Sequence, residues 1–207
     1  MSAASLCAVN WLERESAQIA KGLRRRDPDM LDHLIEVYQH RLLRYLIYLT
    51  GHREFAEDLF QETWMRVLER GSQYNGKSRF DTWLFAIARH LVIDASRKKR
   101  AISLDALTDP SRDSGHVPLE FAGVDPTPFD LTIMRQESKR VMSALARLDV
   151  VQREVVMLRF QEDMSLEEIA DITEAPLSTV KSRLYRGLEA LRPILASRNE
   201  IAKGVGA

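Results

Sequence analysis

The sequence contains a single cysteine, few glycines and prolines for its length, and no long uncharged apolar run. Cys7 cannot form an internal disulfide, and one thiol does not make a structural metal site. Nine glycines and seven prolines in 207 residues argue against a turn-rich all-β fold. No stretch approaches the roughly 18 uncharged apolar residues of a membrane span, so we expect no membrane insertion. The N-terminal segment also lacks the basic start and apolar run of a secretory signal, which favours a cytoplasmic protein.

Recognisable catalytic and metal-binding patterns are missing as well. The sequence has no phosphate-binding glycine motif of the GxxxxGK[ST] or GxGxxG type, and no Ser-His-Asp set is suggested. Its histidines do not occur at ligand spacings such as HxxxH; they are His33, His40, His52, His90 and His116. We therefore expect no enzyme activity, no metal and no cofactor.

The net charge is zero, but the charges are distributed unevenly along the chain. Residues 1–100 carry +4, residues 101–134 carry −5, residues 135–175 carry −3 and residues 176–207 carry +4. Two basic regions are thus separated by an acidic one, which suggests two separate contacts with a polyanion.

Apolar residues recur at three- and four-residue spacings in the first hundred residues. This period predicts helices over 30–50, about 54–70 and 81–100, with a polar, glycine-containing loop between the second and third. Asp81 or Thr82 is expected to cap the third helix. The side chains predicted to be buried on the second and third helices are Phe55, Leu59, Thr63, Val67, Leu68, Trp83, Leu84, Ile87, Leu91 and Val92.

The composition changes after Arg100. Residues 102–132 are acidic, hold four of the seven prolines and show no sustained period, so they predict a flexible linker. A second helical unit follows, and the predicted fold class is all-α, with two small helical domains joined by this linker. The assigned divisions are an N-terminal extension (1–24), a first domain (25–101), the linker (102–132), a second domain (133–196) and a tail (197–207).

The segment "SLEEIADITEAPLSTVKSRLYRGLEALR", residues 165–192, is typical of a helix-turn-helix. Ser165 and Glu168 form a capping-box pattern at its start. The expected inner face comprises Leu166, Ile169, Ala170 and Ile172 of the first helix and Leu177, Val180, Leu184 and Leu188 of the second. The outward residues of the second helix are then Ser178, Thr179, Lys181, Ser182, Arg183, Tyr185 and Arg186. Donors and cations of this kind contact base edges and phosphates when such a helix enters the major groove. A solvated basic face on an ordinary helical hairpin is the alternative, but the absence of acids between Pro176 and Leu188 favours DNA.

An acidic face is predicted on the helix over 54–70. It consists of Glu57, Asp58, Gln61 and Glu62, and by itself it would indicate only solubility. Next to a DNA-binding domain, however, such a face would repel phosphates, and it fits a basic protein surface better.

Three segments together resemble the bacterial extracytoplasmic-function sigma factors of the sigma-70 family. They are "FAEDLFQETWMRVLER", "FDTWLFAIARHLVIDASRKKR" and the helix-turn-helix segment, and they occur in that family's order and at its separations. The resemblance covers about residues 25–100 and 135–195. It implies a promoter-specificity subunit of RNA polymerase that acts in a stress response. The implied partners are core polymerase, promoter DNA and an anti-sigma factor.

The resemblance also implies three sets of functional residues. Asp58, Gln61 and Glu62 match positions that bind the clamp helices of the largest polymerase subunit. Contacts to the −10 element are implied for Tyr74, Asn75, Gly76, Lys77, Arg89, His90, Arg97 and Lys98, and in addition for Lys99 and Arg100. Contacts to the −35 element are implied for the outward residues of the second helix named above. Phe80 and Trp83 are expected in the core, and Glu174 occupies a turn position where the family often has glycine, because the backbone tends to be left-handed there.

Two other functions remain open at the level of sequence. A stand-alone helix-turn-helix transcriptional regulator would use the same DNA-binding end, but it would leave the acidic face without a role. An enzyme with an appended DNA-binding module would need a catalytic cluster that the sequence does not suggest.

Overall fold

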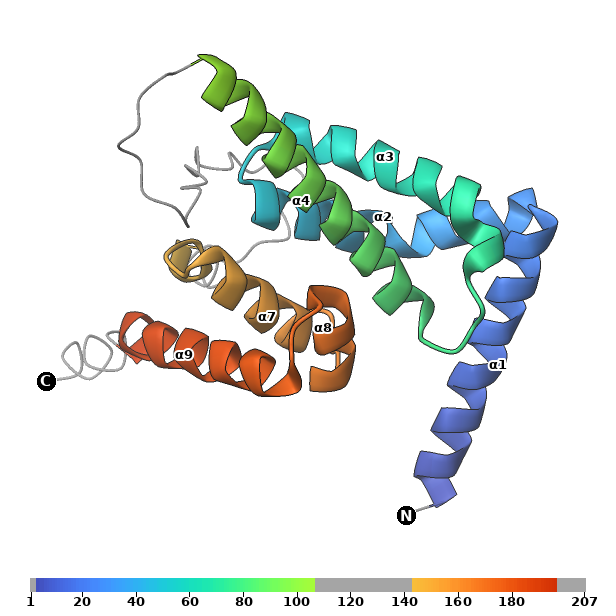
Figure 1. Ribbon diagram of the computed structural model, residues 1–207. Helices are drawn as coiled ribbons and strands as arrows, with labels where there is room; N and C mark the ends of the chain where they lie inside the picture. Colours follow the sequence, from blue (N-terminus) through green and yellow to red (C-terminus); the bar gives the residue numbers. More distant parts are fainter. Residues whose placement is uncertain (1–2, 107–142, 197–207) are drawn as a thin grey trace, which may run out of the picture. The chain divides into compact units, whose positions relative to one another are not determined.

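The structure is a computed structural model that describes residues 3–106 and 143–196 (Figure 1). These residues form helices and short connections without any β-strand, which confirms the predicted all-α fold. The chain divides into two compact units at residues 120 and 121, and each unit is described by itself. Most of the predicted linker, from 107 to 132, lies outside the described residues, as does the predicted tail.

The first unit follows the predicted helices closely. Its elements are α1 (Ala3–Arg25), α2 (Pro28–Thr50), α3 (Arg53–Arg70), the 3₁₀ turn η1 (Gly71–Gln73) and α4 (Phe80–Ala106). Helices α2, α3 and α4 each begin one or two residues before the predicted start, and α4 includes the first five residues of the predicted linker. The predicted N-terminal extension is almost entirely helix α1, an element that the sequence analysis did not assign.

Local capping explains where α2 begins and ends. The Asp27 side chain accepts a hydrogen bond of 3.1 Å from the Asp29 amide. Pro28 lies in the first turn, where the missing N–H of proline costs nothing because first-turn N–H groups have no partner within the helix. At the other end Gly51 takes a left-handed φ of 72°, and its amide donates to the Ile47 carbonyl at 2.8 Å.

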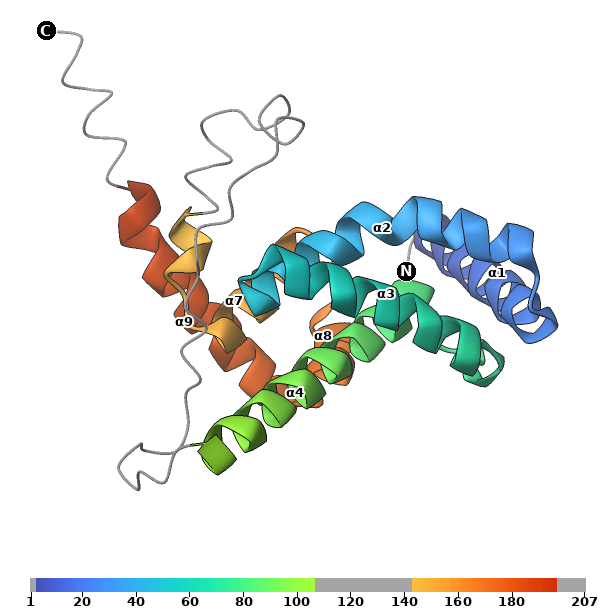
Figure 2. The same ribbon diagram turned by 90° about the horizontal axis from the view of Figure 1, so that it is seen from above.

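Helices α2, α3 and α4 pack together as a three-helix bundle (Figure 2). Its centre holds side chains with no exposed area, among them Leu42, Leu46, Val67, Leu84 and Phe85. The rings of Tyr45 and Phe85 meet edge to face at 4.8 Å between centroids. This core fixes the face that each helix leaves to solvent.

Some predicted core positions are wrong. Leu68 is 45% exposed, and Trp64 and Ala56 are buried on α3 in its place. On α4, Leu84 and Val92 are buried as predicted, while the side chains of Trp83, Ile87 and Leu91 are only partly covered. The helical period was right, but the side that is buried depends on the neighbouring helices.

The second unit contains a helical turn over 143–146 followed by α7 (Val150–Phe160), α8 (Leu166–Thr173) and α9 (Leu177–Ala196). A buried arginine, Arg153, joins the first two of these. Its guanidinium donates to the carbonyls of Leu145, Ala146 and Leu148 at 2.9, 3.1 and 2.8 Å. Arg153 thereby gives hydrogen-bond partners to the carbonyls of Ala146 and Leu148, and it is a second donor to the Leu145 carbonyl, which also accepts from the Leu148 amide at 3.0 Å.

Candidate nucleic-acid and protein interfaces

The acidic surface of α3 faces solvent. It consists of Asp58, Gln61 and Glu62, all of which are exposed. Glu62 is paired with Arg66 of the same helix at 3.0 Å, and the neighbouring Glu57 is paired with Arg53 at 2.9 Å. Exposed pairs of this spacing contribute only about 0.3–0.5 kcal/mol, so a stronger partner can replace them.

Two apolar side chains continue the acidic surface along α3. Met65 is 53% exposed and Leu68 is 45% exposed. Because residues three and four apart share a helix face, Met65 lies beside Gln61 and Glu62, and Leu68 lies beside Met65. Leu68 is thus not the core residue that the helical period predicts, and Met65 was not predicted. The surface is therefore acidic at one end and has two exposed apolar side chains at the other.

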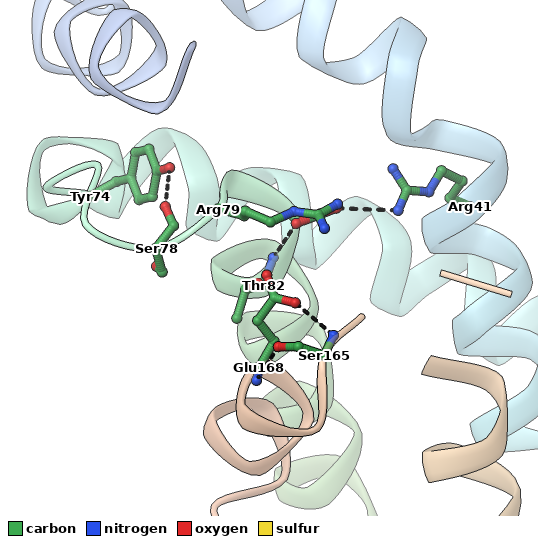
Figure 3. Close-up of polar contacts among 8 residues, drawn as sticks. Arg41, Tyr74, Ser78, Arg79, Thr82, Ser165 and Glu168 are labelled. Atoms are coloured by element: carbon green, nitrogen blue, oxygen red, sulfur yellow. Dashed lines mark hydrogen bonds and ion pairs between the residues drawn. The ribbon is translucent and has the colours of Figure 1, made fainter. Parts of the chain in front are cut away.

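The loop over residues 74–79, which joins η1 to α4, is held by its own side chains. Tyr74 is only 2% exposed, and its hydroxyl donates to the Ser78 carbonyl at 2.7 Å (Figure 3). The Asn75 side chain accepts from the Lys77 amide at 2.9 Å, and Gly76 has a left-handed φ of 73°. Of the predicted −10 residues in this loop, Asn75 and Lys77 are exposed, whereas Tyr74 is buried and supports the loop from within.

An aromatic cluster lies at the base of this loop. The Tyr74 ring is 5.6 Å from Phe80 and 5.2 Å from Trp83, and Phe80 is 5.3 Å from Tyr38 of α2. Phe80 is 2% exposed and belongs to the core as predicted, while Trp83 is partly exposed at the edge of the cluster. Such ring contacts stabilise the loop beyond simple burial of apolar area.

The buried carboxylate of Asp81 fastens the end of the loop to α2. Its Oδ2 atom accepts hydrogen bonds from Arg79 and, at 3.3 Å, from Arg41, and its Oδ1 atom accepts from the Thr82 amide at 2.9 Å (Figure 3). The prediction that Asp81 or Thr82 caps α4 is wrong, because the helix begins at Phe80 and both residues lie in its first turn. Asp81 instead joins Arg41 on α2 to Arg79 in the loop.

The predicted basic positions of α4 differ in exposure. His90, Arg97 and Lys98 are exposed, and Arg89 is partly covered. The Nδ1 atom of His90 lies 2.7 Å from the Ala86 carbonyl. Residues 90 and 97 are seven apart and share one side of the helix, so with Lys98 they form a basic stripe along α4, which begins directly after loop 74–79.

The helix-turn-helix has the predicted caps and turn. The Glu168 amide donates to Ser165 Oγ at 3.1 Å, and the Ser165 amide donates to Glu168 Oε2 at 2.8 Å, which confirms the capping box (Figure 3). Glu174 ends α8 with φ 49° and ψ 38°, which confirms the expected left-handed turn. Gly187 of α9 lies against α7, where an added Cβ would come within 2.9 Å of a Val156 methyl group.

The recognition surface of α9 is the set of predicted −35 residues. Ser178, Lys181, Tyr185 and Arg186 are exposed, Tyr185 by 71%, while Thr179, Ser182 and Arg183 are partly covered. The predicted inner residues Val180 and Leu184 are buried, Leu177 is partly covered, and Leu188 is 37% exposed and so is not part of the core. The N-terminal half of α9 therefore presents hydroxyl groups and cations to solvent without an acid among them.

Two other kinds of site are absent from the residues that the structure describes. In 3–106 and 143–196, no three His, Cys, Asp or Glu side chains are placed to hold a metal ion. No helix in the same ranges is long and apolar enough to cross a membrane.

Comparisons with known proteins match both units. Residues 34–102 match the family model of sigma-70 region 2, and residues 138–191 match that of sigma-70 region 4. The chain is 32% identical over 165 residues to the ECF RNA polymerase sigma factor SigX of Bacillus subtilis, covering 77% of this chain and 80% of SigX. It is 29% identical over 183 residues to SigW of the same organism, covering 87% and 95%.

Two solved structures have a similar fold. The sigma factor RpoE of Bartonella quintana, in complex with the anti-sigma factor NepR, matches with a TM-score of 0.58 and 24% identity over 81% of this chain and 97% of that chain. CnrH, in complex with the cytosolic domain of CnrY, matches with a TM-score of 0.60 and 20% identity over 88% and 98%.

Proposed function

The chain belongs to the sigma-70 family of RNA polymerase sigma factors, in its extracytoplasmic-function group, and from this membership we propose a specific role for each of its surfaces. The protein is a sigma factor that brings core polymerase to promoters. We propose that it has no catalytic activity of its own and that it acts in the cytoplasm, where polymerase and DNA are found.

The acidic surface of α3 binds core polymerase in this proposal. Asp58, Gln61 and Glu62 make the contact, and the weak exposed pair between Glu62 and Arg66 gives way to the partner. The partner is a basic helical surface, for which the family implies the clamp helices of the largest subunit. Met65 and Leu68 bury apolar area at one end of the same contact. Charge steers the encounter, and the apolar end slows dissociation.

Loop 74–79 and the basic stripe of α4 act together on the −10 element. Asn75 and Lys77 are the exposed side chains of the loop, and they are suited to an unstacked base and its phosphate. His90, Arg97 and Lys98 contact the neighbouring backbone, with Arg89 behind them. Tyr74 and Gly76 shape the loop.

The recognition surface of α9 reads the −35 element. Lys181, Arg183 and Arg186 provide cations, and Ser178, Thr179, Ser182 and Tyr185 provide hydroxyl groups for base edges or phosphates. Replacing a cation that touches only phosphate should weaken binding to all sequences and reduce the salt dependence by about one charge. Replacing a residue that touches a base should relax specificity at one position.

An inhibitory protein of the anti-sigma class is the fourth proposed partner. The support is that one similar solved structure holds a sigma factor bound to the anti-sigma factor NepR, and the other holds CnrH bound to the cytosolic domain of CnrY. Such a protein would have to cover the acidic surface or the recognition surface, because these are the surfaces that polymerase and promoter require.

The observation that best supports the proposal is the presence of the acidic surface in the same chain as the helix-turn-helix. The test is the double variant Asp58→Asn/Gln61→Ala, with Glu36→Gln as its control. Glu36 is an exposed acid on α2, so the control removes the same charge from another helix. The double variant should bind core polymerase at least about tenfold more weakly, which corresponds to about 1.4 kcal/mol, and the control should bind normally.

Transcription from a linear promoter template provides the second measurement. Wild-type protein with core polymerase should start transcripts that core alone does not start, and the double variant should need a higher concentration to do so. Undiminished polymerase binding by the double variant would remove the assignment of α3. Sequence-specific activation that needs no binding to core polymerase would favour the stand-alone regulator instead.

A further inference from the structure

Helix α1 lies against the segment that leads into loop 74–79, and two glycines make this approach possible. A Cβ at Gly71 would lie 3.2 Å from the Cβ atom of Leu23, and a Cβ at Gly76 would lie 3.0 Å from the Ser16 carbonyl oxygen and 3.4 Å from Ala17 Cα. Gly76 also has a left-handed φ of 73°. The loop backbone therefore rests on the α1 backbone, with no space for a side chain between them.

Buried polar side chains lie where the same two elements meet. The Tyr74 hydroxyl donates to the Ser78 carbonyl at 2.7 Å. The Ser16 side chain lowers the pKa of Tyr74, as a nearby hydrogen-bond donor does, against the larger effect of burial. Ser16 is 7% exposed and Tyr74 is 2% exposed. Burial raises the pKa of Tyr74, so the phenol keeps the proton that it gives to Ser78.

We propose that α1 positions the promoter-reading loop, with Ser16 as a positioning residue that sets the base preference at the −10 element. This inference rests on the proposed role of loop 74–79 in reading that element. Ser16 does not touch DNA. Its backbone supports Gly76 in the middle of the loop, Tyr74 holds Ser78, and Asn75 and Lys77 lie between Tyr74 and Ser78. Helix α1 precedes the segment that matches sigma-70 region 2, which begins at residue 34.

A change at Ser16 can alter the position of loop 74–79 without unfolding the protein, because Ser16 lies outside the core of the three-helix bundle. The central apolar side chains come from α2, α3 and α4, whereas Ser16 contributes one hydroxyl at the edge of the aromatic cluster. Loss of that hydroxyl removes the polar group that acts on Tyr74 from α1 and leaves the core contacts in place. The loop can then shift while the protein remains folded and the acidic surface is unchanged.

The experiment uses a DNA library with randomised −35 and −10 segments, selected on the complete holoenzyme and then sequenced. The variants are Ser16→Ala, the conservative Ser16→Thr, and Gly76→Ala, which pushes the loop from the other side. Gln18→Ala is the control, because Gln18 is an exposed residue of the same helix. Core polymerase binding and tryptophan fluorescence are measured alongside.

Ser16→Ala should reduce the preference for the favoured −10 base about fivefold, the factor that one ordinary hydrogen bond provides. Gly76→Ala should reduce it at least as much, and Ser16→Thr should retain it. The −35 preferences and polymerase binding should not change, which a general loss of folding would not allow. Unchanged −10 preferences in both Ser16→Ala and Gly76→Ala would overturn the inference. If the wild-type holoenzyme selected no base at either element, the proposed function itself would fail.

Discussion

The buried Asp81 carboxylate gives a sharp prediction about redundancy. Its side chain is 2% exposed, and it is shared by Arg41 and Arg79, whose side chains are 29% and 35% exposed. When one arginine is removed, the other still compensates the charge. When both are removed, the Thr82 amide is the one hydrogen-bond partner left to Asp81 among the residues that the structure describes.

The expected losses in the free energy of unfolding follow from this redundancy of the two arginines. Arg41→Met and Arg79→Met should each lower the free energy of unfolding by about 1 kcal/mol or less, because both guanidinium groups are partly solvated. Methionine keeps much of the apolar stem, which matters for Arg41 because its guanidinium carbon lies 5.2 Å from the centre of the Tyr38 ring. The double variant leaves a buried, uncompensated carboxylate and should lose about 3–5 kcal/mol. The two changes should therefore be non-additive by about 1–3 kcal/mol.

Urea unfolding followed by tryptophan fluorescence measures the loss of stability in the first structural unit, which contains Asp81. The three tryptophans are Trp11, Trp64 and Trp83, all within the first 106 residues, so the signal reports on the unit that contains Asp81. Adding Asp81→Asn to the double variant should recover at least about 1 kcal/mol, because the unpaired charge is then gone. Additive single changes, or a triple variant no more stable than the double, would refute the reasoning.

Three further predictions concern other parts of the chain. Ser165→Ala should lower the stability of the second unit by about 1 kcal/mol through loss of the α8 cap, measured by circular dichroism during unfolding. Gly187→Ala should destabilise the same unit despite a helix-propensity gain of about 1 kcal/mol, because its Cβ would meet Val156 at 2.9 Å; adding Val156→Ala should recover part of the loss. Burial raises the pKa of Tyr38 from 10.0 to about 12, so the unfolded chain loses this proton first, and stability should fall as the pH rises from 10 towards 12. Tyr38→Phe should flatten that fall in unfolding experiments at different pH values.

Local signals explain why the helix boundaries could be predicted. The Asp27–Pro28 start of α2, its Gly51 end and the Ser165 capping box are all interactions within a few residues. The left-handed turn at Glu174 was expected from the resemblance, because the family often has glycine at this position. Such features need no knowledge of the rest of the chain.

Features that join distant segments were missed. Helix α1 has buried residues at Ser16, Ile19, Ala20 and Leu23, a helical spacing present in the sequence. That spacing gives no sign of its partners, which are α2 and the turn after α3. The partner of Arg41 is Asp81, forty residues away, and no local pattern indicates that contact.

The candidate site shows the same division. The helical period of α9 predicts which of its residues are exposed. Only one face of this helix is buried against other helices, and the recognition surface lies on the opposite face. Exposure of the −10 loop does not follow in that way, since Tyr74 points inward and Gly76 turns the backbone. Which side chains a loop presents depends on the elements beneath it, here the aromatic cluster and α1.

The zero net charge is consistent with basic surfaces on α4 and α9 that bind DNA weakly when the protein is by itself. Non-specific affinity for DNA rises steeply with the number of phosphates that a protein neutralises. The chain has separate basic surfaces on α4 and α9, and the acids elsewhere offset them in the far field. The exposed acidic surface on α3 is the one that we propose to bind polymerase rather than phosphate. If the two basic surfaces bind DNA as proposed, holding both on one polymerase would raise their effective concentration and make promoter binding conditional on assembly.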